Sequence, residues 1–184
     1  VYANITSFSI FAPLGNTTPV HNIDTGENFS WIQDAIDDSG TVDGNTIVAD
    51  PEIYPENVDV YKRLTITSTP GNTSTTIVSA SNSSDHVFNV TANWTNITGL
   101  TIQNATTGGY AGIYLNATSY CNISSNKVTN NSYGIYLAGA SNNNLTSNNA
   151  TNSTYGFFLE ISNNNNLTNN TAWNNTNIGI YLLY

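Results

Sequence analysis

A repeat of fixed length fills the last part of the chain. Four segments there begin with related tetrapeptides whose leading glycines are Gly112, Gly134, Gly156 and Gly179, spaced by 22, 22 and 23 residues. A constant period near twenty residues is typical of solenoid proteins, in which each repeat forms one coil and stacks on its neighbours. This feature restricts the architecture more than any local propensity does.

Apolar residues recur in register within the repeat and form columns. The columns are Ile113, Ile135, Phe157 and Ile180; Leu115, Leu137, Leu159 and Leu182; Ile123, Leu145 and Leu167; and Val128, Ala150 and Ala172. Apolar and polar positions alternate, and Asn, Ser and Gly separate the short segments, which indicates strands and turns. One repeat cannot bury its own apolar side chains, so we predict an all-β solenoid with coils about 4.8 Å apart.

Asparagines flank these columns at positions that predict the corners between strands. They are Asn104, Asn130, Asn152 and Asn174 on one side and Asn126, Asn148 and Asn170 on the other. Asn tolerates the left-handed conformation and bonds locally to the backbone, so it suits a tight corner. We expect inward amides at Asn130, Asn152 and Asn174, and hydrogen bonds between stacked amides. A disordered Asn-rich tract is the alternative, but it has no reason to keep apolar columns in phase.

The repeat resembles the right-handed parallel β-helix repeats of NosD-like proteins, a family similar in fold to the pectin-lyase superfamily. The segments FSWIQDAIDD, NTIVADPEIYPENVDVYKRLTI and NITGLTIQNA carry the resemblance upstream, so that it covers roughly residues 25–184. It implies a right-handed parallel β-helix whose N-terminal mouth is closed by a short helix. Many such chains look like surface proteins of archaea and bacteria, but fold alone is a weak guide to activity.

Two parts of the chain are expected. Residues 1–20 form an extended arm, and residues 21–184 form the β-helix, with regular 22-residue coils from residue 112. Within the β-helix we predict a capping helix near residues 29–38, where Ile32, Ala35 and Ile36 share a face. Ser30 and Gln33 have the spacing of a capping box at its start.

Composition limits the partners and the compartment. Lys and Arg number 3 against 12 Asp and Glu, so the net charge of -9 disfavours nucleic acid. No apolar run is long enough to span a membrane. The chain opens on VYANIT without an initiator Met, which we interpret as a mature form that has lost a leader and is secreted or held at the cell surface. The single cysteine, Cys121, is in register with Asn143 and Asn165, so we expect an inward, inert thiol.

Many Asn-x-Ser/Thr sequons support export, although a chain rich in Asn, Ser and Thr also generates sequons by chance. Inward corner amides cannot carry a glycan, whereas residues beside the third column point outward, with glycans one coil apart crowding one another. The glycosylation candidates are Asn4, Asn16, Asn72, Asn82, Asn93, Asn116, Asn122, Asn144 and Asn166. We therefore expect covalently attached glycans.

Both ends of the chain suggest self-assembly. GIYLLY stops on a strand in mid-coil without a polar cap, and solenoids need terminal caps. An apolar patch in the arm could cover that end in the same chain or in a neighbour, and a heterologous contact between neighbours propagates into filaments or arrays. The interface candidates are Phe8, Ile10, Phe11, Ile180, Leu182, Leu183 and Tyr184.

An aromatic ladder is predicted on the outer face of the coils. Tyr114, Tyr136, Phe158 and Tyr181 alternate with the buried columns. Stacked rings stabilise adjacent strands. The same strip could also hold sugar rings or dock a lateral subunit, because exposed apolar patches mark contacts.

Catalysis and metal binding find little support in the residues. Lyases of this fold use a basic residue, and this chain has only Lys62, Arg63 and Lys127, whereas glycosidases need two facing carboxylates. Copper, implied by the family name, would have only the separated His21 and His86 and a lone Cys121, with no Met.

A weak calcium site near Asp37, Asp38 and Asp43 is the one alternative to a chain without cofactors. We predict that the protein is not an enzyme but a structural, glycosylated subunit of a filament, sheath or surface layer, joined head to tail with copies of itself. The alternative is a carbohydrate-binding or carbohydrate-cleaving β-helix module.

Overall fold

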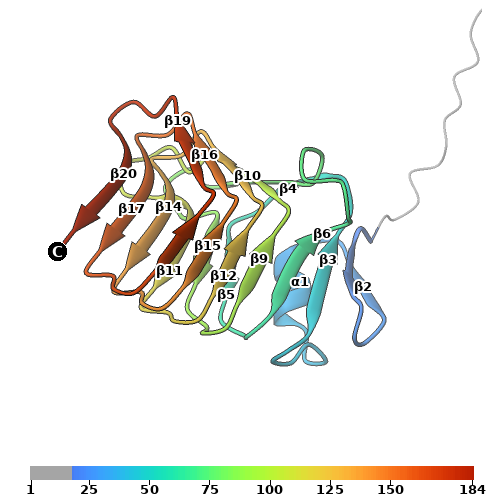
Figure 1. Ribbon diagram of the computed structural model, residues 1–184. Helices are drawn as coiled ribbons and strands as arrows, with labels where there is room; N and C mark the ends of the chain where they lie inside the picture. Colours follow the sequence, from blue (N-terminus) through green and yellow to red (C-terminus); the bar gives the residue numbers. More distant parts are fainter. Residues whose placement is uncertain (1–17) are drawn as a thin grey trace, which may run out of the picture.

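The computed structural model describes residues 18–184 and shows a right-handed parallel β-helix of six coils. Each coil passes in turn through three sheets, which we call A, B and C (Figure 1). Sheet A contains β1 (Val20–Asn22), β2 (Glu27–Phe29), β3 (Thr46–Ala49), β6 (Thr65–Ser68), β9 (Asn96–Thr98), β12 (Asn122–Ser124), β15 (Asn144–Thr146) and β18 (Asn166–Thr168). Sheet B contains β4 (Ile53–Pro55), β7 (Ile77–Ser79), β10 (Thr101–Gln103), β13 (Lys127–Thr129), β16 (Asn149–Thr151) and β19 (Thr171–Trp173). Sheet C contains β5 (Val58–Val60), β8 (Phe88–Val90), β11 (Ala111–Asn116), β14 (Tyr133–Ala138), β17 (Tyr155–Glu160) and β20 (Ile178–Leu183).

The predicted apolar columns are confirmed by strand register and burial. In sheet C, Ile113 pairs with Ile135, which pairs with Phe157, and all three side chains are fully buried. The third column lies in sheet A and the fourth in sheet B. Each coil therefore adds one layer to a continuous apolar core, because identical positions stack at every turn.

The glycine of each repeat is required by close approach between coils. A Cβ atom at Gly134 would lie 2.4 Å from the carbonyl oxygen of Gly156, and one at Gly156 would lie 2.5 Å from that of Gly179. Real Cβ atoms do not approach backbone oxygen so closely, so only glycine fits this column.

Side-chain amides inside the corners connect successive coils. The backbone N–H of Asn126 donates to Oδ1 of Asn148 (3.1 Å), and that of Asn148 donates to Oδ1 of Asn170 (2.9 Å). Nδ2 of Asn148 donates back to the carbonyl oxygen of Ile123 in the preceding coil (2.7 Å). Two further ladders repeat this pattern at other corners, one through Cys121, Asn143 and Asn165 and the other through Asn131, Ser153 and Asn175. Because these backbone groups are buried, the ladders satisfy donors that would otherwise lack partners.

A different set of corner asparagines points out of the coil, and here the prediction of inward amides was wrong. Asn130, Asn152 and Asn174 are exposed, with φ of 56°, 52° and 55°. The left-handed conformation expected at these corners is therefore present, but it turns the side chains towards solvent. The inward amides are those of the ladders through Asn148 and Asn143.

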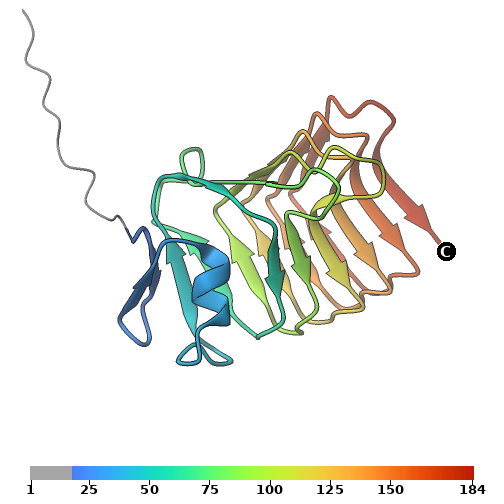
Figure 2. The same cartoon turned by 180° about the vertical axis from the view of Figure 1, so that it is seen from behind.

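Helix α1 (Ile32–Asp37) lies over the N-terminal end of the coils (Figure 2), and it buries Ile32, Ala35 and Ile36 as predicted. The predicted capping box was wrong, because the N-cap residue is Trp31 and it makes no side-chain cap bond. The carboxylate of Glu56 caps the helix instead, accepting the N–H groups of Ile32 (3.0 Å) and Gln33 (2.9 Å). Burial nevertheless raises the pKa of Glu56.

The first coils contain elements that the sequence pattern did not indicate. Strands β1 and β2 pair antiparallel with each other, and β1 pairs antiparallel with β3, which ends sheet A with a hairpin. Val20, assigned to the arm, begins β1 and is fully buried. Residues 1–17 of the predicted arm lie outside the described residues.

Candidate functional surfaces

The predicted aromatic ladder runs along the outer face of sheet C. Ring centroids are 5.0 Å apart between Tyr114 and Tyr136, 5.0 Å between Tyr136 and Phe158, and 5.1 Å between Phe158 and Tyr181. The planes are tilted by 36° to 87°, and Phe158 is only 8% exposed. The rings therefore pack mainly on one another, as stabilising neighbours do.

A second aromatic column, which the sequence analysis missed, lies beside the first. Tyr133 and Tyr155 are stacked with centroids 5.2 Å apart, and Tyr133 also contacts Phe158 at 4.9 Å. Both tyrosines directly precede a repeat glycine, so their 22-residue spacing could have predicted this second column. Burial raises the pKa of Tyr133 and of Tyr136, whose hydroxyl donates to the Glu160 carboxylate.

His86 extends the strip upstream. Its ring stacks on Tyr114 with centroids 4.2 Å apart and an angle of 14°. Nδ1 accepts the backbone N–H of Ala111 (3.0 Å), and burial lowers the pKa of the imidazole. This histidine is therefore held neutral as a packing element of the strip.

The outer face of sheet A is a ladder of sequons. Strands β9, β12, β15 and β18 are each one Asn-x-Ser/Thr tripeptide, with an inward apolar residue in the middle. Nδ2 of Asn144 donates to Oδ1 of Asn122 (3.0 Å), and Nδ2 of Asn166 donates to Oδ1 of Asn144 (3.0 Å). Adjacent coils are about 4.8 Å apart, so glycans on the sequon asparagines of adjacent strands would collide.

The other glycosylation candidates are scattered over corners and loops. Asn82, Asn93 and Asn116 are exposed, and Asn72 is half-buried. Asn4 and Asn16 lie outside the described residues. The corner residues Asn130, Asn152 and Asn174, predicted to point inward, are exposed and begin accessible sequons.

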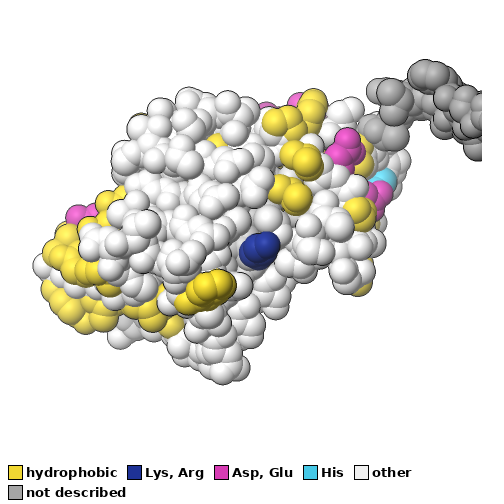
Figure 3. Space-filling view, turned by 90° about the horizontal axis from the view of Figure 1, so that it is seen from above, with side chains coloured by type: hydrophobic (Ala, Val, Ile, Leu, Met, Phe, Trp, Pro, Cys, Tyr) yellow, Lys and Arg dark blue, Asp and Glu magenta, His cyan; other side chains and the backbone are white. Residues whose placement is uncertain are grey.

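The outer edge of the last coil is apolar. Ile180 is 51% exposed and Leu182 is 49% exposed, although the equivalent Phe157 and Leu159 one coil inward are buried. Leu183 and Tyr184 are also exposed, and hydrophobic side chains gather at this end of the molecule (Figure 3). Among the described residues no strand pairs with the outer edges of β18, β19 and β20. Phe8, Ile10 and Phe11, the other predicted interface residues, lie outside the described range.

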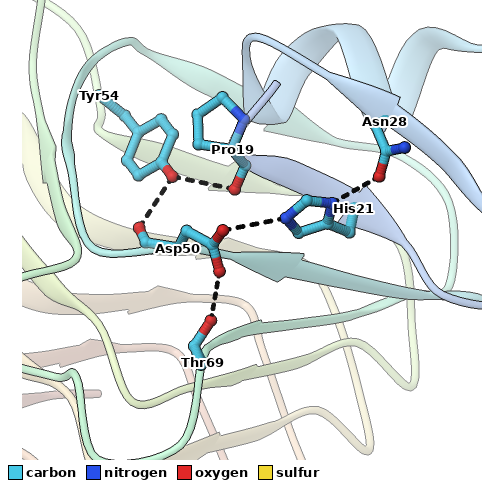
Figure 4. A network of polar contacts seen from close by, with 6 residues as sticks. All are labelled: Pro19, His21, Asn28, Asp50, Tyr54 and Thr69. Carbon is cyan, nitrogen blue, oxygen red and sulfur yellow. Dashed lines mark hydrogen bonds and ion pairs between the residues drawn. The ribbon is translucent and has the colours of Figure 1, made fainter. Parts of the chain in front are cut away.

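A polar network joins the hairpin to the first coil (Figure 4). Nδ1 of His21 lies 2.5 Å from Oδ1 of Asn28, and Nε2 lies 3.1 Å from Oδ2 of Asp50. Thr69 Oγ1 donates to the other oxygen of Asp50 (2.6 Å). Both partners of the His21 ring are oxygen acceptors. The pKa of the imidazole is therefore raised, most by the hydrogen bond to Asn28 and next by the one to Asp50. Both ring nitrogens of His21 and the Thr69 hydroxyl are engaged, so the network connects β1 and β2 to the segments that follow β3 and β6.

The described residues do not fit copper. Within residues 18–184 no three His, Cys, Asp or Glu side chains gather to hold a metal ion. His21 and His86 make the contacts given above, and Cys121 is buried, which raises the pKa of its thiol. The carboxylates considered for calcium have separate roles, because Asp38 accepts the N–H of Gly40 and Asp43 accepts that of Arg63.

Comparison with known proteins agrees with this architecture. The model of the family described as periplasmic copper-binding protein (NosD) matches residues 38–184. The chain is also 35% identical over 117 residues to a cell surface glycoprotein of Methanothermus fervidus, a match that covers 64% of this chain and 18% of that protein. The matched part thus spans less than a fifth of the relative. No solved structure matched, and no helix within residues 18–184 is long and apolar enough to cross a membrane.

Proposed function

The chain belongs to the family described as periplasmic copper-binding protein (NosD), and on that premise we propose that it is a structural, non-enzymatic subunit of a glycosylated assembly at the cell surface. The similarity to an archaeal cell surface glycoprotein supports the location and the glycans. The outward sequons of sheet A and the exposed corners offer many attachment points. The misfit to copper ligation favours a structural role over metal transport.

The similarity to a cell surface glycoprotein, together with the outward sequons, carries the proposal of a surface subunit, and the apolar edge of the last described coil supports the head-to-tail contact. Ile180 and Leu182 occupy core positions yet are half exposed, beside three strand edges that present unpaired backbone groups. Such edges pair readily with another chain. Completing the burial of each of the two side chains would stabilise the contact by about 1 kcal/mol. The backbone hydrogen bonds of an added strand would stabilise it further.

A second copy of this chain is the proposed occupant of that edge. The β-helix of a neighbour cannot stack there with its own N-terminal coil, because α1 and the β1–β2 hairpin close that end. The apolar residues ahead of β1, Phe8, Ile10 and Phe11, are the remaining candidates for the added strand. Such a contact joins two different surfaces and therefore propagates head to tail.

Substitution of the edge tests the assembly. We expect the wild-type protein to form concentration-dependent polymers in sedimentation velocity and negative-stain microscopy. Leu182→Asp and deletion of residues 1–12 should both give monomers. Ile23→Asp, which changes an exposed apolar residue in the turn between β1 and β2, is the matched control and should polymerise normally. Monomeric wild-type protein, or polymers that survive both changes, would refute the head-to-tail arrangement.

A carbohydrate-binding or carbohydrate-cleaving module is the second candidate, and it is favoured by the double aromatic column. Half-exposed tyrosine rings provide surfaces on which sugar rings can stack. The tight packing of the rings on one another and the engagement of Glu160 by Tyr136 favour the structural interpretation. Dispersed monomers that bind polysaccharide through Tyr114 and Tyr181 would favour this second candidate instead.

A further inference from the structure

A groove lies at the corner where the early coils pass from sheet C to sheet A. Its volume is about 400 Å³, within the range of small-ligand clefts. Tyr61 and Trp94 are half exposed there, so two aromatic rings face solvent beside charged groups. The residues that line it are Asp43, Tyr61, Arg63, Ala92, Asn93 and Trp94.

Trp94 belongs to a pair of exposed rings held in an unfavourable backbone conformation. Its ring stacks on that of Tyr120 in the next coil, with centroids 4.4 Å apart and planes at 16°. Both residues have left-handed backbones, with φ of 62° and 61°, which bulky side chains rarely adopt. Later coils place Asn142 and Asn164 at left-handed positions of the same corner. Strain of this kind at an exposed aromatic pair points to a role in contact with a ligand.

Asn93 stands at the rim of the groove and begins the sequon Asn93-Trp94-Thr95. Its Oδ1 accepts the backbone N–H of Ser119 in the next coil (2.8 Å). Nδ2 has no hydrogen-bond partner among the described residues, so a substituent on this nitrogen would leave the corner intact. The Nδ2 atom of Asn93, a residue that lines the groove, is therefore available for an N-linked sugar.

We propose that Asn93 carries an N-linked glycan whose first sugar packs in this groove against the ring of Trp94; this inference rests on the glycosylation proposed above. The apolar face of a sugar matches an aromatic ring, while its hydroxyl groups need donors and acceptors. Arg63 supplies donors, since its guanidinium forms no ion pair within residues 18–184, and Asp43 supplies a carboxylate oxygen.

The attachment uses a glycosyl phosphate donor and a separate transferase. Nδ2 of Asn93 forms a bond to the anomeric carbon while the anomeric carbon–oxygen bond breaks. The phosphate leaves with the bonding electrons, and one amide proton is released. The hydroxyl of Thr95 is fully buried and donates to the carbonyl oxygen of Ala92 (3.0 Å), so transfer must precede closure of this corner.

The experiment uses the full chain from a host that glycosylates Asn-x-Ser/Thr sequons and from one that does not. Glycopeptide mass spectrometry should find a glycan at Asn93. In the glycosylated protein Asn93→Gln should lower the unfolding midpoint by about 2–4 °C more than it does in the unglycosylated protein. Trp94→Asn keeps the sequon and places at this corner the residue found in later coils, so it should fold and abolish that difference. Asn82→Gln removes an exposed sequon from a loop outside the groove, and its effect should not depend on Trp94.

Four results would overturn the proposal. Glycans found at other sequons but not at Asn93 would reject this site and leave the proposed glycoprotein intact, whereas no glycans at all would reject both. If Asn93→Gln lowered the unfolding midpoint of the glycosylated protein as much in the Trp94→Asn variant as it does when Trp94 is present, the sugar would not pack on the ring. Saturable quenching of unglycosylated protein by N-acetylglucosamine, lost in Trp94→Asn, with Asn93 unmodified, would assign the groove to a free saccharide instead.

Discussion

Replacing Asn148 by alanine tests whether the inner amide ladders hold the coils together. Asn148 is 1% exposed, accepts the backbone N–H of Asn126 and donates to the carbonyl oxygen of Ile123. Alanine leaves the N–H of Asn126 buried without a partner, which costs about 1–3 kcal/mol, and removes the side-chain hydrogen bond to the Ile123 carbonyl, which costs about 0.5–1.5 kcal/mol. The free energy of unfolding should therefore fall by about 2–4 kcal/mol, a large part of the about 5–15 kcal/mol typical of a domain.

Asn144→Ala is the matched control for this prediction. Asn144 lies in the same coil and also bonds along the axis, to Asn122 at 3.0 Å, but both side chains face solvent. Water replaces the lost partner, so the change in the free energy of unfolding should stay within about 0.5 kcal/mol. Unglycosylated protein is used, because Asn144 also begins a sequon.

Urea unfolding followed by far-ultraviolet circular dichroism measures both variants. A repeat protein can depart from two-state behaviour, so a shift in the transition midpoint is compared at an unchanged slope. Similar small losses for Asn148→Ala and Asn144→Ala would refute the reasoning, since they would mean that water reaches the inner ladder. A large loss for both would show that axial hydrogen bonding stabilises the fold irrespective of burial.

Three further predictions concern packing, pH and the thiol. Gly134→Ala should destabilise the protein by about 1–3 kcal/mol because the new Cβ meets a backbone oxygen, whereas Gly108→Ala, with open space around its Cβ, should be neutral in the same urea titration. The raised pKa of His21 means that its contribution is fully present below pH 6.5 and is lost as pH rises through the folded pKa. The pair with Asp50 is partly exposed, so the midpoint difference between wild type and His21→Gln should correspond to less than about 1 kcal/mol and should shrink with rising pH. Cys121 should react with a thiol reagent only after unfolding, because it is buried and its pKa is raised.

Each of these three predictions would be contradicted by a specific result. Equal free energies of unfolding for Gly134→Ala and Gly108→Ala would mean that adjacent coils can move apart to accommodate the new Cβ without loss of stability. A difference for His21→Gln that grows above pH 6.5 would show that the neutral imidazole is the stabilising form. Rapid labelling of native Cys121 would show that the corner opens.

The regular part of the fold was predictable from the amino-acid sequence. Every coil repeats the same environment, so Ile113, Ile135 and Phe157 report one position three times, and the alternation beside them defines which face is buried. The outer aromatic ladder followed from the same alternation. The inward Cys121 also followed, because register with Asn143 placed it in a corner.

Details that depend on contacts between unlike segments were not predictable in this way. The helix cap is supplied by Glu56, which lies outside the local pattern that indicated Ser30, because a neighbouring coil places a carboxylate at the helix start. The left-handed conformation of Asn130 was expected, but the outward direction of its side chain depends on the path of the corner, which apolar spacing does not specify.

The groove at Trp94 illustrates the same limit at a candidate site. It combines Asp43, Tyr61 and Asn93 from different coils, and none of these residues belongs to the regular repeat. Periodicity specifies how like positions stack, because stacking brings together residues one period apart. Where coils differ in length and composition, the partners of a side chain depend on the path of the folded backbone, and that path exists only in three dimensions.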